Sequence, residues 1–128
     1  MIINDSFSFK PKSILITGGC GFIGSNFIRH VLKSNKELQV INVDSLTYAG
    51  NLENLSDVDS NPNYIFINAD IRDNDVLIDI FGKYSPDSVL NFAAESHVDR
   101  SINNPNIFFE TNVGGTLNLL NLSLNNNV

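Results

Sequence analysis

The sequence predicts an α/β fold built on a parallel β-sheet, and three observations lead to this prediction. Four short runs of strand length recur along the chain, at 13–17, 40–44, 64–68 and 88–92. Each run is apolar almost throughout and contains β-branched or aromatic residues, which is typical of strands buried on both faces. Stretches with helical apolar spacing separate most of the runs, and this alternation favours parallel strands joined by right-handed crossovers.

The spacing of apolar residues and the capping residues predict three helices. From Ile23 onwards, apolar residues recur every three or four positions, so they share one helix face. A second helix is expected from about Asp73, a good N-cap residue, to Tyr84. A third begins near Pro105, which suits a first helical turn, and continues past Leu120. The connection at 45–63 is less regular and predicts only a short helical turn at 51–55.

Size and composition indicate one globular domain. The chain has 128 residues, of which 42% are hydrophobic and 17% charged. We expect a polar N-terminal extension over 1–12, without the pattern of a secretory signal, followed by one domain over 13–128. No apolar run approaches the roughly 18 residues of a membrane span. The net charge of −6 without a basic stripe argues against nucleic acid as a partner.

Cysteine and histidine usage excludes two further classes of protein. Cys20 is the single cysteine, so an internal disulfide is excluded and a reducing, cytoplasmic setting is favoured. We interpret Cys20 as a small buried residue. His30 and His97 have no cysteine or acid at ligand spacing, so we expect no metal site.

The stretch "LITGGCGFIG" (15–24) places four glycines between the first strand and the first helix. Two registers fit: Gly19, Gly21 and Gly24 form G-x-G-x-x-G, whereas Gly18, Gly21 and Gly24 form G-x-x-G-x-x-G. In a dinucleotide site, such glycines permit a tight turn, let the backbone approach the pyrophosphate, and allow close helix–strand packing. The helix N-terminus then offers N–H groups to the phosphates. The sequence therefore predicts a Rossmann-type sheet with its first four strands in the order 3-2-1-4.

Asp44 closes the second strand, twenty residues after Gly24. This offset matches the carboxylate that hydrogen-bonds the adenosine ribose in dinucleotide-binding folds. An acid at this position would also repel a 2′-phosphate, which favours NAD over NADP. The alternative is that Asp44 only caps the end of the strand.

Four stretches carry a resemblance to a known family. "TGGCGFIGSNF" (17–27) resembles the opening of extended short-chain dehydrogenases that act on nucleotide sugars. "DSLTYAGNLENL" (44–55) and "NFAAESHVDRSI" (91–102), followed by "ETNVGGT" (110–116), closely resemble the dTDP-glucose 4,6-dehydratases within that family. The resemblance covers nearly all of the chain after Lys12. Ser45 and Asn91 depart from it, because lysine and histidine are common at these positions.

The resemblance implies NAD as cofactor and dTDP-glucose as the substrate of the full enzyme. It implies that Ser96 also contacts the sugar nucleotide, although a serine here could instead cap a helix. His97 is interpreted as structural, and Asp99 and Arg100 as residues that pair or cap locally. The residues implied to bind the cofactor are Gly18, Gly21, Phe22, Ile23, Gly24, Asp44, Ser45, Leu46, Thr47, Asp70, Ile71, Phe92, Ala93, Ala94, Glu95, Ser96 and Thr111.

The same resemblance implies that this chain carries no catalytic residue. The family's chemistry needs a Tyr-x-x-x-Lys pair, in which lysine lowers the tyrosine pKa. Tyr48, Tyr64 and Tyr84 are followed four residues later by leucine, asparagine and serine. We therefore expect a truncated Rossmann-type domain without its C-terminal half and substrate domain, inactive alone and homodimeric in the full enzyme. The last predicted helix is apolar around most of its circumference, which is consistent with missing cover.

Two alternative functions remain open at this stage. The chain could be a non-catalytic, truncated paralogue that binds NAD or pairs with a full-length subunit. It could also belong to a related nucleotide-sugar epimerase or decarboxylase, because sugar selection lies mostly downstream of this part of the family pattern.

Overall fold

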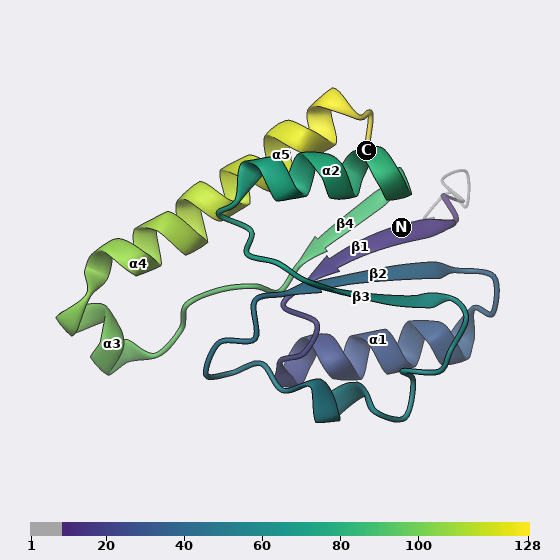
Figure 1. Ribbon diagram of the computed structural model, residues 1–128, viewed down its shortest axis with the longest axis horizontal. Helices are drawn as coiled ribbons and strands as arrows, with labels where there is room; N and C mark the ends of the chain where they lie inside the picture. The colour runs from purple at the N-terminus through teal and green to yellow at the C-terminus, as the bar shows by residue number, and fades with distance from the viewer. Residues whose placement is uncertain (1–8) are drawn as a thin grey trace, which may run out of the picture.

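The computed structural model describes residues 9–128, which form a four-stranded parallel sheet with helices on both faces (Figure 1). The strands are β1 (Ser13–Thr17), β2 (Gln39–Asp44), β3 (Tyr64–Asn68) and β4 (Ser88–Asn91). Their order is β3-β2-β1-β4, which confirms the predicted order 3-2-1-4 and the parallel sheet. Residues 1–8 of the expected N-terminal extension lie outside the described residues, and residues 9–12 lead directly into β1.

The helices begin and end close to the predicted positions. α1 (Phe22–Ser34) follows the glycine-rich turn, a 3-10 turn η1 (Leu52–Leu55) interrupts the long connection, and α2 (Asn74–Tyr84) follows β3. Asp73 caps α2 as predicted, because its side chain accepts a hydrogen bond from the Val76 N–H at 3.2 Å.

The helix predicted from near Pro105 to past Leu120 is confirmed, because 105–125 is helical without a break, but it contains a π-helical segment and follows a short helix that was not predicted. A short helix, α3 (Val98–Asn103), precedes α4 (Pro105–Phe109), a π-helical segment η2 (Glu110–Gly115) and α5 (Thr116–Asn125). Such π segments are uncommon and occur often at functional sites. At the end of this π segment the helix lies close to the loop after β3, because a Cβ on Gly115 would lie only 2.5 Å from Cδ1 of Ile71.

Two apolar layers enclose the sheet. On one face, Ile28 and Leu32 of α1 pack with Ile16 of β1 and Val40 of β2. On the other face, α2 and α5 pack together against the side chains that point the opposite way from β1 and β2, as Figure 1 shows for the helices. The alternation confirms that β1 and β2 are buried on both faces, as their nearly continuous apolar sequence predicts.

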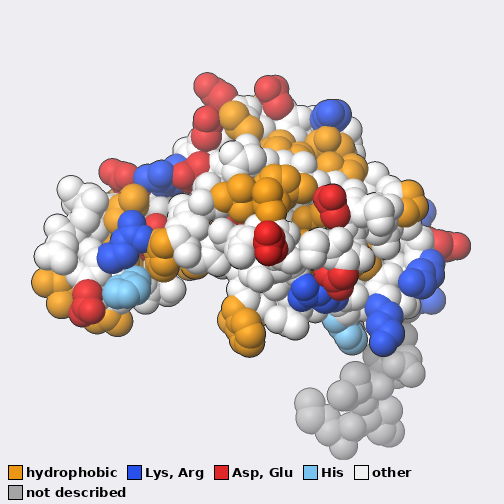
Figure 2. Space-filling view, turned by 60° about the horizontal axis from the view of Figure 1, so that its bottom comes forward, with side chains coloured by type: hydrophobic (Ala, Val, Ile, Leu, Met, Phe, Trp, Pro, Cys, Tyr) orange, Lys and Arg blue, Asp and Glu red, His pale blue; other side chains and the backbone are white. Residues whose placement is uncertain are grey.

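The C-terminal helix is buried on one side only. Leu119 and Leu122 reach the core, whereas a stripe on the other side is exposed. We call this the outer stripe; it comprises Phe109, Val113, Leu117, Leu120 and Leu124, with exposed fractions of 51–78%. Figure 2 shows further hydrophobic side chains on the surface at the left-hand end of the molecule, where α3 and the start of α4 lie. The predicted helix with apolar residues on more than one face is thus confirmed.

A small polar cluster lies inside the core beneath the glycine-rich turn. The Asn42 side-chain amide donates to the Tyr64 hydroxyl at 2.9 Å and to the Cys20 Sγ at 3.5 Å. Burial raises the pKa of the Cys20 thiol to about 11 and the pKa of the Tyr64 hydroxyl to about 12. Cys20 is fully buried, which confirms its interpretation as a small core residue.

These two raised pKa values predict that the fold weakens in alkali. In the unfolded chain the thiol and the phenol ionise near their ordinary pKa values of 9.0 and 10.0. In the folded state both groups stay protonated to higher pH than in the unfolded chain. The free energy of unfolding should therefore fall as pH rises from about 9 to about 12. The loss should be on the order of 1.4 kcal/mol per unit of pKa difference.

Urea unfolding at a series of pH values measures this dependence. A double variant with Cys20→Ala and Tyr64→Phe removes both titrating groups and should flatten the fall above pH 9. An equally steep fall in the double variant would show that other groups cause the alkaline loss.

Candidate functional site

The carboxyl ends of all four strands meet at one edge of the sheet. The parallel register pairs Thr17 of β1 with Val43 of β2 and Asn91 of β4, so the loops that follow these strands lie side by side. A cleft opens at this edge, in the position where open parallel α/β sheets bind ligands. Of the sequence-predicted residues, it is lined by Gly18, Gly21, Asp44, Ser45, Thr47, Asp70, Ile71, Phe92, Ala93, Ala94, Glu95 and Thr111.

The glycine-rich turn forms the part of the cleft next to α1. Gly18 has φ +67°, a conformation that disfavours other residues, and a Cβ there would lie 2.5 Å from the Ala93 nitrogen. A Cβ on Gly24 would collide with the Gly18 carbonyl oxygen, so α1 can pack this closely on the turn only with glycine at 24. Gly19 faces the core instead, against the Asn42 side chain. The geometry therefore favours the register of Gly18, Gly21 and Gly24.

The first turn of α1 begins at the cleft, because its N-cap residue Gly21 lines it. The turn is open around Gly21, because a Cβ there would meet only the Gly18 oxygen at 3.4 Å and the Ala49 oxygen at 3.9 Å, both ordinary contact distances. The side chains of Phe22 and Ile23 are exposed, at 83% and 66%, and do not line the cleft. Only their backbone N–H groups, which every helix leaves unpaired at its start, would be available to a ligand at this point.

The Asp44 carboxylate is fixed at the end of β2. Its Oδ2 accepts a hydrogen bond from the Cys20 N–H and its Oδ1 from the Leu46 N–H, each at 2.8 Å. The side chain is only 7% exposed and still lines the cleft. Gly50 packs directly against it, since a Cβ on Gly50 would lie 2.7 Å from Oδ1. Asp44 thus caps the loop that follows β2 and presents a pre-oriented acceptor to the cleft.

Leu46 supports the loop after Asp44 without lining the cleft. Its φ of +52° is unusual for a leucine, and the hydrogen bond from its N–H to Asp44 fixes that turn. The Leu46 side chain packs against the core on the α1 side.

The Glu95 side chain is buried at the opposite end of the cleft. Its backbone is held reciprocally by Asn112: the Glu95 N–H donates to Asn112 Oδ1 at 2.8 Å, and Asn112 Nδ2 donates to the Glu95 carbonyl at 2.9 Å. Within residues 9–128, the Glu95 Oε2 atom is buried and has no hydrogen-bond partner. A buried carboxylate oxygen without a donor is costly, so a ligand that brings hydroxyl or amide donors would stabilise it.

The structure brings together the two most specific sequence stretches. The Arg100 guanidinium lies 4.3 Å from the centre of the Tyr48 ring, and the His97 ring meets Tyr48 edge-on at 6.1 Å. Arg100 therefore stacks on Tyr48 and lines the cleft, whereas the sequence predicted a local role for it with Asp99. Adjacent residues on a helix point in different directions, which separates Asp99 from Arg100.

Ser96 lies just outside the cleft. It is exposed and precedes His97, which is the N-cap of α3, so Ser96 does not cap that helix. Sequence reasoning also missed the lining residues Arg72, Ile107 and Gly50. Gly50 carried a signal, because a glycine in the quoted "LTYAGN" stretch indicates a close backbone approach.

The glycine cradle, the fixed Asp44 carboxylate and the unpaired Glu95 oxygen fit a ligand with a phosphate group and several hydroxyl donors. Together with the 3-2-1-4 parallel sheet, they define a nucleotide-binding domain of the Rossmann type. The family model described as GDP-mannose 4,6 dehydratase matches residues 15–128, and the chain belongs to that family.

The comparisons with individual proteins agree with this assignment. The chain is 54% identical over 110 residues to a dTDP-glucose 4,6-dehydratase of Salmonella typhimurium, covering 86% of this chain and 30% of the relative. The dTDP-glucose 4,6-dehydratase DesIV of Streptomyces venezuelae, solved with NAD, superposes with a TM-score of 0.83 at 46% identity. A UDP-glucose 4-epimerase of Thermotoga maritima, solved with UDP-glucose, gives a TM-score of 0.81 at 34% identity.

These matches involve only part of each relative. The superposition covers 91% of this chain in both cases, but only 37% of DesIV and 35% of the epimerase. The chain thus spans about 30% of the length of the curated relatives that it matches. Within residues 9–128, no helix is long and apolar enough to cross a membrane, and no group of three or more metal-binding side chains gathers.

Proposed function

We propose that this chain is the NAD-binding portion of a dTDP-glucose 4,6-dehydratase. The observation that carries the proposal is the glycine-rich turn at the start of α1, with the pre-oriented Asp44 carboxylate at the end of the neighbouring strand. The identity of 54% to the dehydratase of Salmonella typhimurium and 46% to DesIV, against 34% to the epimerase of Thermotoga maritima, favours the dehydratase over an epimerase.

Each part of the cleft suits one part of the dinucleotide. The N–H groups of Phe22 and Ile23, with Gly18, Gly21 and Gly24 around them, would hold the pyrophosphate. The Asp44 carboxylate would accept hydrogen bonds from the hydroxyls of the adenosine ribose. The loop that follows it lines the cleft with Ser45 and Thr47 and turns at Leu46.

The remaining lining residues would hold the two ends of the cofactor. Asp70 and Ile71 follow β3, where the adenine base would lie. Phe92, Ala93, Ala94 and Glu95 follow β4, and Thr111 faces them from the π-helical segment, where the nicotinamide half would lie. Ser96, exposed beyond them, would reach the sugar nucleotide.

When bound, NAD supplies a reversible hydride acceptor for the sugar, while the residues of this chain bind and orient it. No Tyr-x-x-x-Lys pair occurs in the 128 residues, so we expect NAD binding without turnover of dTDP-glucose by this chain alone. A reducing, cytoplasmic setting suits the free thiol of Cys20.

Calorimetric titration of the chain with NAD and with NADP tests the proposal. NAD should bind at least roughly tenfold more tightly than NADP, because the Asp44 carboxylate opposes a 2′-phosphate. Absence of NAD binding to folded chain would refute the proposal, and formation of a 4-keto-6-deoxy sugar by purified chain would refute its inactivity.

We further propose that the outer stripe forms a homodimer contact in the full enzyme. Its five large apolar side chains recur at helical spacing on α4, η2 and α5 and are more than half exposed. A continuous apolar stripe is stabilised when another apolar surface covers it. The same stripe on a second copy of the chain would provide such a surface across a two-fold axis.

Charged substitutions in the outer stripe should therefore abolish self-association. We expect Leu117→Lys with Leu120→Lys to shift the sedimentation coefficient to that of a monomer while leaving the core intact, because both residues are more than half exposed. Ile78→Lys is the matched control, since Ile78 is 47% exposed on α2, outside the stripe. A wild-type chain that sediments as a monomer at all concentrations would contradict the dimer proposal.

A further inference from the structure

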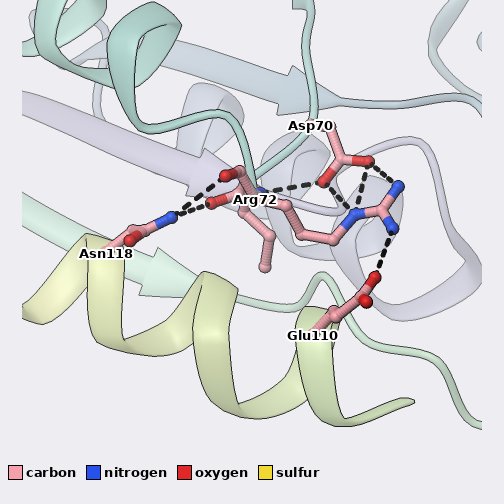
Figure 3. Close-up of polar contacts among 5 residues, drawn as sticks. Asp70, Arg72, Glu110 and Asn118 are labelled. Carbon is pink, nitrogen blue, oxygen red and sulfur yellow. Dashed lines mark hydrogen bonds and ion pairs between the residues drawn. The ribbon is translucent and has the colours of Figure 1, made fainter. Parts of the chain in front are cut away.

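Arg72 lies where the loop after β3 meets the C-terminal helix. Its Nη2 donates to the Asp70 Oδ2 atom at 2.6 Å, and its Nη1 reaches the Glu110 Oε2 atom at 3.4 Å (Figure 3). Arg72 also lines the cleft, next to Asp70 and Ile71. It thus joins the part of the cleft after β3 to the segment that carries Thr111.

The Asp70 carboxylate is held by Arg72 from several directions. The Arg72 backbone N–H donates to Oδ1 at 2.9 Å, and the Nε and Nη2 groups of the guanidinium donate to the same carboxylate. These contacts number four, but the single Nε hydrogen is shared between Oδ1 and Oδ2, so only three hydrogens reach the carboxylate. A carboxylate has about four acceptor positions, which leaves room for one further hydrogen. The Asp70 carboxylate is therefore fixed in one orientation and can still accept one further donor.

The C-terminal helix also holds the backbone of this loop. Asn118 Nδ2 donates to the carbonyl oxygens of Ile71 and Arg72, at 3.1 Å and 3.3 Å (Figure 3). Gly115 lets the same helix contact the Ile71 side chain. The loop at 70–72 is thus fastened to the helix both through its main chain and through the Arg72 side chain.

The position of this loop points to the base of the dinucleotide. β3 neighbours β2 on the side away from the glycine-rich turn, and Asp44 stands at the end of β2. A dinucleotide with its pyrophosphate at α1 and its ribose at Asp44 therefore places its base over the end of β3, against Asp70 and Arg72. The donor that adenine offers to an acceptor there is its exocyclic amino group.

We propose that Arg72 is a positioning residue that aims the Asp70 carboxylate at the exocyclic amino group of adenine. Arg72 thereby sets the preference of the cleft for adenine over a purine that carries a carbonyl group instead. This inference rests on the proposed NAD site. The hydrogen bonds from the Arg72 guanidinium also lower the pKa of the Asp70 carboxyl, which keeps this acceptor ionised.

A merely structural ion pair predicts a different result. The Arg72 side chain is 38% exposed, and pairs with this exposure contribute little to the stability of a fold. Loss of Arg72 should therefore leave the melting temperature almost unchanged, whereas the discrimination between bases should fall. The ratio of affinities for two dinucleotides isolates this effect from any general weakening.

The experiment is calorimetric titration of the intact chain with NAD and with its hypoxanthine analogue, which has a carbonyl in place of the adenine amino group. The variants are Arg72→Ala, Arg72→Lys and Glu110→Gln. Lys83→Ala is the charge-matched control, because Lys83 lies in the last turn of α2, at the end of that helix farther from the cleft. Melting temperatures without ligand show whether each variant folds.

The wild type should prefer NAD over the analogue by roughly tenfold, and Arg72→Ala should reduce this preference to roughly twofold. Arg72→Lys and Glu110→Gln should give intermediate preferences, since each keeps part of the clamp on Asp70. Lys83→Ala should retain the wild-type ratio.

Two results would overturn the inference while leaving NAD binding intact: a wild type that binds both dinucleotides equally, or an Arg72→Ala variant with the full preference. If Arg72→Ala does not fold, the ratios of Arg72→Lys and Glu110→Gln decide the question in the same way. A folded wild type that binds neither dinucleotide would refute the proposed function itself.

Discussion

Gly24→Ala is expected to abolish NAD binding and to destabilise the fold by about 3 kcal/mol, the upper part of the range for an overpacked site. The added methyl group would collide with the carbonyl oxygen of Gly18 and lie 2.7 Å from the Gly19 Cα. Both obstacles are backbone atoms, which cannot rotate away as a side chain would. The start of α1 would have to move from the glycine-rich turn, and the phosphate cradle would move with it.

A matched pair of glycine variants separates binding from folding. Gly82→Ala, in α2 with no atom within 4 Å of the added carbon, should stabilise the protein by roughly 0.5–1 kcal/mol and keep NAD affinity. The methyl group of Gly21→Ala would meet only the Gly18 oxygen at 3.4 Å and the Ala49 oxygen at 3.9 Å, so this variant should fold while its methyl group intrudes on the pyrophosphate position.

Urea unfolding and NAD titration of these three variants give the measurement. Retention of wild-type NAD affinity by folded Gly21→Ala and by Gly24→Ala would show that the turn does not hold a phosphate. The pyrophosphate assignment would then be wrong.

Asp44→Asn is expected to lower NAD affinity by roughly a hundredfold, because the ribose hydroxyls lose a charged acceptor. The preference for NAD over NADP should shrink as well, because the charge that opposes the 2′-phosphate is gone. The fold itself should lose about 1–3 kcal/mol. The reason is that Asp44 accepts from two backbone N–H groups, and the amide nitrogen of asparagine would face one of them with its own hydrogens.

The control for Asp44 is Asp57→Asn. Asp57 also receives hydrogen bonds, from the Arg29 guanidinium, but it lies on the surface outside the cleft. We expect no measurable change in NAD affinity or in the NAD to NADP ratio for this variant. Calorimetric titrations of Asp44→Asn and Asp57→Asn with NAD and NADP, each below the melting temperature of the variant, give this comparison. An Asp44→Asn variant with the wild-type ratio of NAD to NADP affinity would exclude Asp44 from cofactor selection.

Local patterns were sufficient to predict most of the sheet. The strands at 13–17 and 64–68 begin and end as predicted, because a short apolar run between polar residues has few other ways to be buried. The Asp73 cap was predictable for a similar reason, since the cap and the helix that it begins are adjacent in the sequence. The positions of the glycines in the turn were also visible, although two registers fitted equally well.

The C-terminal third was less predictable. The helix α3 has only six residues and no buried one, so it leaves no apolar periodicity to find. The π-helical segment ends at Gly115, which lies against Ile71, a residue 44 positions earlier in the chain (115 − 71). The stacking of Arg100 on Tyr48 likewise joins helix α3 to the loop after β2, two segments that only the sheet brings together.

The sequence by itself determined the parallel sheet, the glycine-rich turn and the acid at the end of β2, because each depends on residues close together in the chain. Only the tertiary structure decided which glycine register faces the cleft, how Asp44 is fixed by the Cys20 and Leu46 N–H groups, and that Arg72 spans from Asp70 to Glu110. These features arise where the ends of four parallel strands converge. A contact between two loops depends on the register of the whole sheet, and no local pattern of residues encodes that register.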